Sequence, residues 1–168
     1  AGHQKRVALL ACAIAKELGM SEDRIEGLEL AAQIHDVGKI QVPAEILSKP
    51  TQLTEIEYMM IQTHPEGGYE ILKDIQFPWP IAEIIRQHHE KLDGSGYPHG
   101  LKEEEIILEA RILTVADIVE AMASHRPYRP ALGIEAALEE IQKERGTKLD
   151  ARVVDVCTAL FRENRFQF

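Results

Sequence analysis

The segment Leu30-Ala31-Ala32-Gln33-Ile34-His35-Asp36-Val37-Gly38-Lys39-Ile40 decides the fold prediction. An apolar stretch with helical spacing ends there in an imidazole and a carboxylate. Unpaired charge and imidazole are costly in a dry core, so His35 and Asp36 need partners. A metal ion is one such partner, because imidazole and carboxylate together bind divalent ions.

The same pattern returns further along the chain. His88-His89 ends the apolar segment 81–87, Asp117 interrupts the apolar segment 112–119, and His64 lies between the first two sites. Taken singly, each group is explained by hydrogen bonding in a core. Taken together, helices from different parts of the chain could bring them to one metal site in a bundle. Composition and spacing leave both interpretations open.

The remaining pattern is helical throughout. Ser21 and the capping box at Thr54-Glu55-Ile56-Glu57 predict helix starts, and Pro80 is expected at the first position of another helix. Turn formers predict loops around 42–43, 93–100 and 126–130, and Pro65 indicates a helix break. No β pattern, repeat or linker is visible. We therefore predict one all-α domain over residues 1–168, with later helices over about 106–123, 134–145 and 151–163.

Composition narrows the function classes. The 168 residues suit one domain, and the net charge of −9 disfavours a nucleic-acid polymer or an anionic membrane surface as partner. A small anionic ligand stays open, because a site can reverse the charge locally. No apolar run approaches the ~20 residues of a membrane span. Cys12 and Cys157 cannot build a disulfide framework, which favours the cytoplasm and buried thiols.

These motifs resemble a known family. His35-Asp36-Val37-Gly38-Lys39-Ile40 is similar to the HD signature of metal-dependent phosphohydrolases. His88-His89-Glu90 followed by Asp93-Gly94-Ser95-Gly96-Tyr97-Pro98 resembles the extended motif of the HD-GYP subfamily. The resemblance runs from His3 to about residue 160. It implies a helical bundle of the HD phosphohydrolase type with a metal site in the core. It also implies a piece of a longer regulatory protein with an upstream sensory or receiver domain.

The resemblance implies a metal site and an activity. Two divalent ions, iron or manganese, would be bridged by Asp36, and a third ion would need a further ligand. The implied activity is hydrolysis of cyclic di-GMP to linear pGpG and then GMP, by hydroxide formed between the metals. Alternatives are hydrolysis of 3′,3′-cyclic GMP-AMP and a catalytically weak module that binds cyclic dinucleotides. The implied metal ligands are His3, His35, Asp36, His64, His88, His89 and Asp117.

The resemblance also suggests how substrate and partners are bound. Asp36 and Lys39 are the expected catalytic residues, and Lys39 is four residues after His35, where it could contact the scissile phosphate. For the loops predicted at 93–100 and 126–130, the alternative to substrate contact is a role in packing alone. The Gly-Tyr-Pro loop is also a candidate contact for a diguanylate cyclase (GGDEF-type) domain, and a homodimer stays open. The other expected substrate-binding residues are Gly96, Tyr97, Pro98, Arg126 and Arg129.

Overall fold

The structure is a computed structural model that describes residues 2–124 and 132–168, and all regular secondary structure in those ranges is helical. The predicted all-α class is confirmed. The long helices are α1 (Gly2–Glu17), α2 (Glu22–Ile34), α5 (His64–Leu72), α6 (Ile81–Gln87), α7 (Leu108–Ala123), α8 (Ile134–Lys143) and α9 (Ala151–Arg162). The short ones are η1 (Val37–Gln41), α3 (Ala44–Leu47), α4 (Glu55–Ile61) and η2 (Glu103–Glu105).

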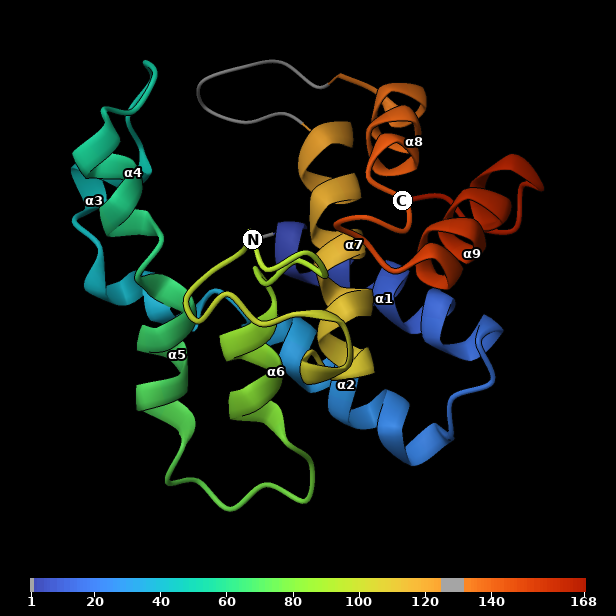
Figure 1. Cartoon of the computed structure of the whole chain (residues 1–168), viewed down its shortest axis with the longest axis horizontal. Coiled ribbons are helices and arrows are strands. Elements are labelled where there is room, and N and C mark those ends of the chain that lie inside the picture. Colours follow the sequence, from blue (N-terminus) through green and yellow to red (C-terminus); the bar gives the residue numbers. More distant parts are fainter. Residues whose placement is uncertain (1, 125–131) are drawn as a thin grey trace.

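Helix α7 lies at the centre of the described bundle. It packs on α1, α8 and α9, while α1 packs on α2 and α5 packs on α6 (Figure 1). The core consists of aliphatic side chains at helical spacing, among them Val7 and Leu10 of α1, Ile84 of α6, and Leu113 of α7. Residues of α1, α2, α6 and α7 that continue these apolar stripes toward one end carry the polar groups of the site.

Two predicted helix starts have the expected capping hydrogen bonds. Ser21 accepts a hydrogen bond from the N–H of Arg24, and the predicted capping box between Thr54 and Glu57 is present. Pro65 lies in the first turn of α5, where the chain breaks between α4 and α5. Pro80 occupies the N-cap of α6 and not the predicted first helical position, so the helix begins one residue later, at Ile81. These features mark the starts of α2, α4 and α6.

The loop expected around residues 42–43 is present, and the short helix α3, which the sequence pattern does not predict, begins directly after it. Together α3, α4 and the turn between them form an arm, residues 44–61, which projects beside α5 (Figure 1). The arm buries little of its apolar surface. Its exposed large hydrophobic residues are Leu47, Ile56, Tyr58, Met59 and Met60.

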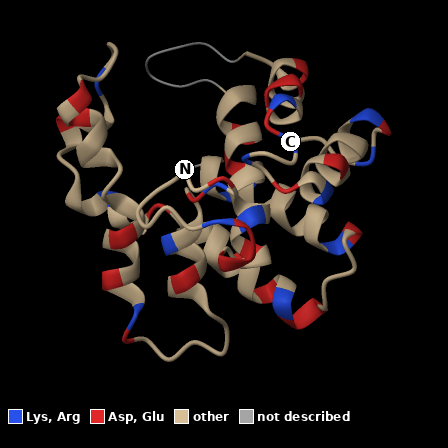
Figure 2. Cartoon of the chain, in the orientation of Figure 1, with Lys and Arg blue, Asp and Glu red and all other residues tan. Residues whose placement is uncertain are grey.

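The surface agrees with the composition. Acidic and basic residues are interspersed along the described helices (Figure 2). Trp79 packs against the core and lies on Gly27. A Cβ at that glycine would lie 2.5 Å from the indole Cγ, so the indole needs a glycine there. Cys157 is buried, Cys12 is half-buried, and both are free thiols. None of the described helices has the length and apolar character that crossing a membrane requires.

Candidate metal centre

The structure brings all seven predicted ligands to one place. They come from α1, the end of α2, the start of α5, the end of α6 and the middle of α7. They fall into three overlapping sets, and within each set the ligand atoms lie within 4.8 Å of one another. The sets are His64, His88 and His89; His3, His35 and Asp117; and His35, Asp36 and His88.

Three of the histidines are oriented by the same local device. Each places its Nδ1 against the backbone carbonyl three residues earlier, in the last turn of a helix, where carbonyls lack a partner within the helix. With Nδ1–H donating to that carbonyl, Nε2 carries the lone pair and points to the centre. The distances are 2.6 Å for His35 to Ala32, 2.7 Å for His64 to Ile61 and 2.5 Å for His88 to Ile85.

The Nε2 atom of His35 tests whether the site fits a cation. It is buried and has no hydrogen-bond partner among the described residues. It lies 3.4 Å from both Asp36 Oδ2 and Asp117 Oδ1. A buried nitrogen without a hydrogen bond demands an explanation, and a cation held between it and two carboxylates provides one. The residues present therefore fit a divalent metal.

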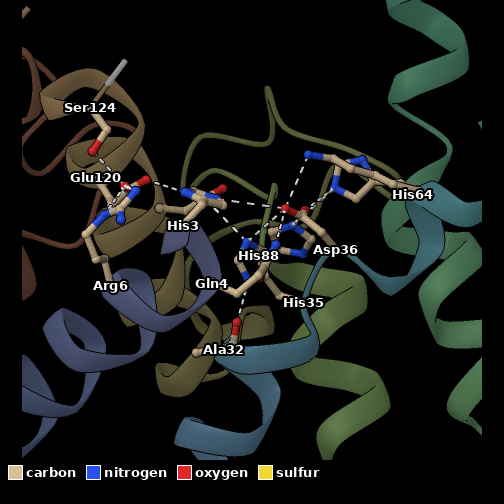
Figure 3. Close-up of polar contacts among 12 residues, drawn as sticks. His3, Gln4, Arg6, Ala32, His35, Asp36, His64, His88, Glu120 and Ser124 are labelled. Atoms are coloured by element: carbon tan, nitrogen blue, oxygen red, sulfur yellow. Dashed lines mark hydrogen bonds and ion pairs between the residues drawn. The ribbon is translucent and has the colours of Figure 1, made fainter. Parts of the chain in front are cut away.

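Asp36 directs its two oxygens toward different neighbours (Figure 3). Oδ1 lies 3.3 Å from His64 Nε2 and 4.0 Å from His88 Nε2. Oδ2 faces the other side, 3.2 Å from Lys39 Nζ, and it accepts a hydrogen bond of 2.8 Å from Gln4 Nε2. The carboxylate thus stands between the ligand sets, as a bridging ligand must.

His3 is held by a buried acid that sequence reasoning missed. Its Nε2 lies 3.1 Å from Asp117 Oδ1, while its Nδ1 contacts the carboxylate of Glu120. Glu120 is fully buried and also accepts hydrogen bonds from Arg6 at 2.8 Å and Ser124 at 2.7 Å (Figure 3). One signal was available, because Glu120 follows Asp117 by about one turn in a segment, residues 112–123, that has no other charged residue.

Protonation differs across the centre. Burial, together with the charge of neighbouring histidines, holds the pKa of His88 well below its usual range, and burial lowers the pKa of His89 to about 3. Burial opposes ionisation of Asp36 and Asp117, but contacts with His64 and with His3 outweigh it and keep both pKa values well below the ordinary one. Burial also opposes protonation of His3 and His35, but contacts with Asp117 outweigh it, so the pKa of His3 is raised to about 9 and that of His35 lies above its usual value. The centre therefore offers neutral imidazoles at His88 and His89 beside ionised carboxylates, whereas a divalent ion at His3 and His35 would displace a proton.

The carboxylate of Glu90 anchors the loop that follows His89. Buried Glu90 accepts hydrogen bonds from the backbone N–H groups of His99 at 2.8 Å and Leu101 at 2.9 Å. Gly96 allows the loop to lie on this segment, because a Cβ there would come within 2.5 Å of Lys91 N and 2.6 Å of Glu90 Cα. The glycine therefore permits a close approach, which motif matching alone did not reveal.

Tyr97 and Pro98 are half-buried beside the centre. The Tyr97 ring stacks on His89, with centroids 5.0 Å apart and an interplanar angle of 12°. Burial and the nearby Tyr58 raise the pKa of the Tyr97 hydroxyl, so it is a neutral hydrogen-bonding group at pH 7. Tyr97 thus forms part of the wall around the metal ligands.

Lys39 is the one predicted substrate contact with a basic group among the described residues, and its amine lies at the centre next to Asp36. The predicted contacts Arg126 and Arg129, and also His125, lie outside the described residues. His99 is half-exposed, and its Nε2 lies 3.2 Å from Glu66, apart from the ligand sets.

Seven histidine and aspartate side chains thus converge in one helical domain, in groups that could hold metal ions. The chain belongs to the HD domain family, whose model matches residues 1–153. This match confirms the recognition made from the His35-Asp36 and Gly96-Tyr97-Pro98 motifs.

The chain resembles curated relatives and a solved structure. It is 45% identical over 153 residues to the cyclic di-GMP phosphodiesterase response regulator RpfG of Xanthomonas campestris, covering 90% of this chain and 40% of RpfG. It is 42% identical over 151 residues to the 3′3′-cGAMP-specific phosphodiesterase 3 of Vibrio cholerae, covering 89% of this chain and 33% of that protein. The chain thus spans less than half the length of these relatives.

Among solved structures, Bd1817, an HDG"Y"P protein from Bdellovibrio bacteriovorus, superposes with a TM-score of 0.79 at 21% identity. The superposition covers 95% of this chain and 51% of that one. At this identity the likeness supports the fold.

Proposed function

We propose that the chain is the catalytic domain of a metal-dependent phosphodiesterase that hydrolyses cyclic di-GMP. The observation that carries the proposal is the position of Asp36, with one oxygen toward His64 and His88 and the other toward His35 and Lys39. Such a carboxylate can serve two cations at once, next to an ammonium group suited to a phosphate oxygen. The names of the relatives supply the substrate class.

The proposed ligands divide into two groups around Asp36. His64, His88 and His89 would hold one ion, and His3, His35 and Asp117 would hold the other. We propose iron or manganese, because both accept imidazole and carboxylate ligands. When bound, such ions stabilise charge on phosphate oxygens and lower the pKa of water.

The residues of the chain would orient the diester. Lys39 would bind a non-bridging oxygen of the scissile phosphate, and Tyr97 would close the side of the centre above His89. In the reaction, a water oxygen bonds to phosphorus while the bond from phosphorus to the ribose 3′ oxygen breaks and that oxygen takes up a proton. The product is linear pGpG with a 5′-phosphate, and a second hydrolysis gives GMP.

The experiment compares substrates on metal-loaded protein prepared without oxygen. The protein is incubated with cyclic di-GMP and, separately, with 3′,3′-cyclic GMP-AMP, and the products are resolved by chromatography. We expect pGpG and about two metal ions per chain by elemental analysis. Faster turnover of cyclic GMP-AMP would favour the activity named for the Vibrio relative. Tight binding of both without any product would establish a binding module instead.

The remaining expectations stay predictions. They are the contact of the Gly-Tyr-Pro loop with a diguanylate cyclase domain, the upstream regulatory domain, homodimer formation and a cytoplasmic location. A pull-down of a purified GGDEF-type domain, compared between wild type and Tyr97→Ala, tests the first of these.

A further inference from the structure

A cavity of about 550 Å³ lies inside the arm, between α3, α4 and the turn that joins them. This volume is within the range of small-molecule sites and holds a nucleobase with its sugar. Its wall combines aliphatic side chains with polar and charged ones. The lining residues used below are Lys39, Ile46, Leu53, Glu55, Tyr58 and Ile61.

Two contacts join this cavity to the metal centre. Lys39 lines the cavity, and its amine lies 3.2 Å from Asp36 Oδ2. Tyr58 lines it too and lies near the hydroxyl of Tyr97, whose ring stacks on His89. A ligand whose phosphate contacts Lys39 can therefore also reach the cavity, because the Lys39 side chain lines it.

The lining has the chemistry of a base pocket. Ile46, Leu53 and Ile61 supply flat apolar surface, and the half-exposed ring of Tyr58 offers an aromatic face for stacking. Glu55 is an exposed carboxylate at the first position of α4. Guanine presents two adjacent N–H donors on its pairing edge, which a carboxylate accepts together, whereas adenine presents a single amino group beside an acceptor nitrogen.

We propose that this cavity receives one guanine base of the cyclic dinucleotide and that Glu55 accepts hydrogen bonds from its pairing edge. The inference rests on the proposed function for its ligand class. Lys49, the other basic group on the wall, is paired with Glu57 at 2.6 Å, whereas Lys39 contacts Asp36 of the metal centre, where the phosphate would bind. Glu55 is the carboxylate of the lining.

The test is calorimetric binding of cyclic di-GMP and cyclic di-AMP to metal-loaded protein. Glu55→Gln should weaken binding of cyclic di-GMP roughly tenfold or more, because a charged acceptor is lost, and should leave binding of cyclic di-AMP nearly the same. Leu53→Trp, which fills the cavity, should weaken both. Glu45→Gln is the matched control, since Glu45 occupies the first turn of α3 without lining the cavity.

Binding and turnover separate the two proposals. An unchanged affinity for cyclic di-GMP in both Glu55→Gln and Leu53→Trp overturns the inference, even when the wild-type protein hydrolyses this substrate. A wild-type protein that binds no guanine dinucleotide overturns it as well. A wild-type protein that binds but does not hydrolyse, with Glu55→Gln weakening the binding, supports the base pocket and refutes the proposed phosphodiesterase activity.

Discussion

The histidines of the centre are supported in two different ways. His35, His64 and His88 are each oriented by a carbonyl three residues away, at a helix end that also positions the residue. His3 is oriented by Glu120, which is 117 residues away in sequence. The first support follows from local chain geometry, and the second exists only once α1 packs on α7. Local support therefore comes with the helix, and remote support depends on tertiary packing.

Removing a locally supported ligand gives the largest expected effect. His88 belongs to two of the three ligand sets, so His88→Ala should lower bound metal and abolish turnover of cyclic di-GMP. Elemental analysis and product chromatography measure both. His99→Ala is the matched control, because His99 lies outside the ligand sets. Full metal content and full activity in His88→Ala would refute the assignment.

Lys39 tests a local contact that is not a ligand. Lys39→Ala should retain the metal and lower kcat/KM about 10²-fold, because a charged donor to the developing phosphate charge is lost. Metal analysis alongside steady-state kinetics checks this, with the exposed Lys16→Ala of α1 as control. A loss of metal equal to that of His88→Ala would show that Lys39 acts by holding the centre together.

Glu120 tests the remote support. Glu120→Gln should lower metal affinity at the set containing His3 by about 10- to 100-fold while the set of His64, His88 and His89 keeps its ion. Titration calorimetry with manganese measures the two affinities. Glu109→Gln is the control, since Glu109 is a buried acid of the same helix that pairs with Arg24. Equal titration curves for Glu120→Gln and wild type, with equal melting temperatures, would contradict the positioning role.

Asp150 has both a local and a remote hydrogen-bond partner, and its substitution should have the smallest effect of these variants. Its Oδ1 caps α9 through the N–H of Arg152 at 2.9 Å, and its Oδ2 accepts from Arg111 at 3.1 Å. Asp150→Ala should lower the free energy of unfolding by about 2 kcal/mol, and Asp150→Asn, which keeps the cap, by less. Urea unfolding at pH 7 measures both.

The difference in free energy of unfolding between the wild type and Asp150→Ala should change with pH in one direction. Burial opposes ionisation of Asp150, but the hydrogen bond from Arg111 outweighs it and lowers the pKa below the usual 3.8. The folded state therefore binds the proton less readily than the unfolded state. The stabilisation is complete above pH 3.8 and disappears as the pH falls through the pKa of the folded state, so the wild type and Asp150→Ala should converge in acid. A difference that grows in acid would contradict this.

The same division explains what the sequence could predict. The helices, the capping box at Thr54 and the position of Lys39 near Asp36 follow from spacing and local chemistry. Glu120 could not be paired with His3 beforehand, because nothing in either segment specifies which helices touch. Gly96 is predicted as a substrate-binding residue, whereas its close approach to the backbone beside Glu90 depends on tertiary structure.

Other features were missed because their signals are weak. The sequence pattern around residues 43–53 contains turn formers, and a helix as short as α3 gives no periodicity to detect. Glu90 belongs to the His88-His89-Glu90 motif, but its hydrogen bonds with the backbone N–H groups of His99 and Leu101 span 9 and 11 residues. Contacts of this kind follow from how a loop folds back, and one-dimensional spacing does not encode that.

The anchoring of the loop by Glu90 has a mechanical consequence. The loop that carries Tyr97 is connected to the bundle through a side chain one peptide bond away from His89. A force applied to the loop, by any molecule that presses on it, is transmitted through two hydrogen bonds to the backbone beside a proposed ligand. A displacement of the loop would therefore also shift the backbone next to His89.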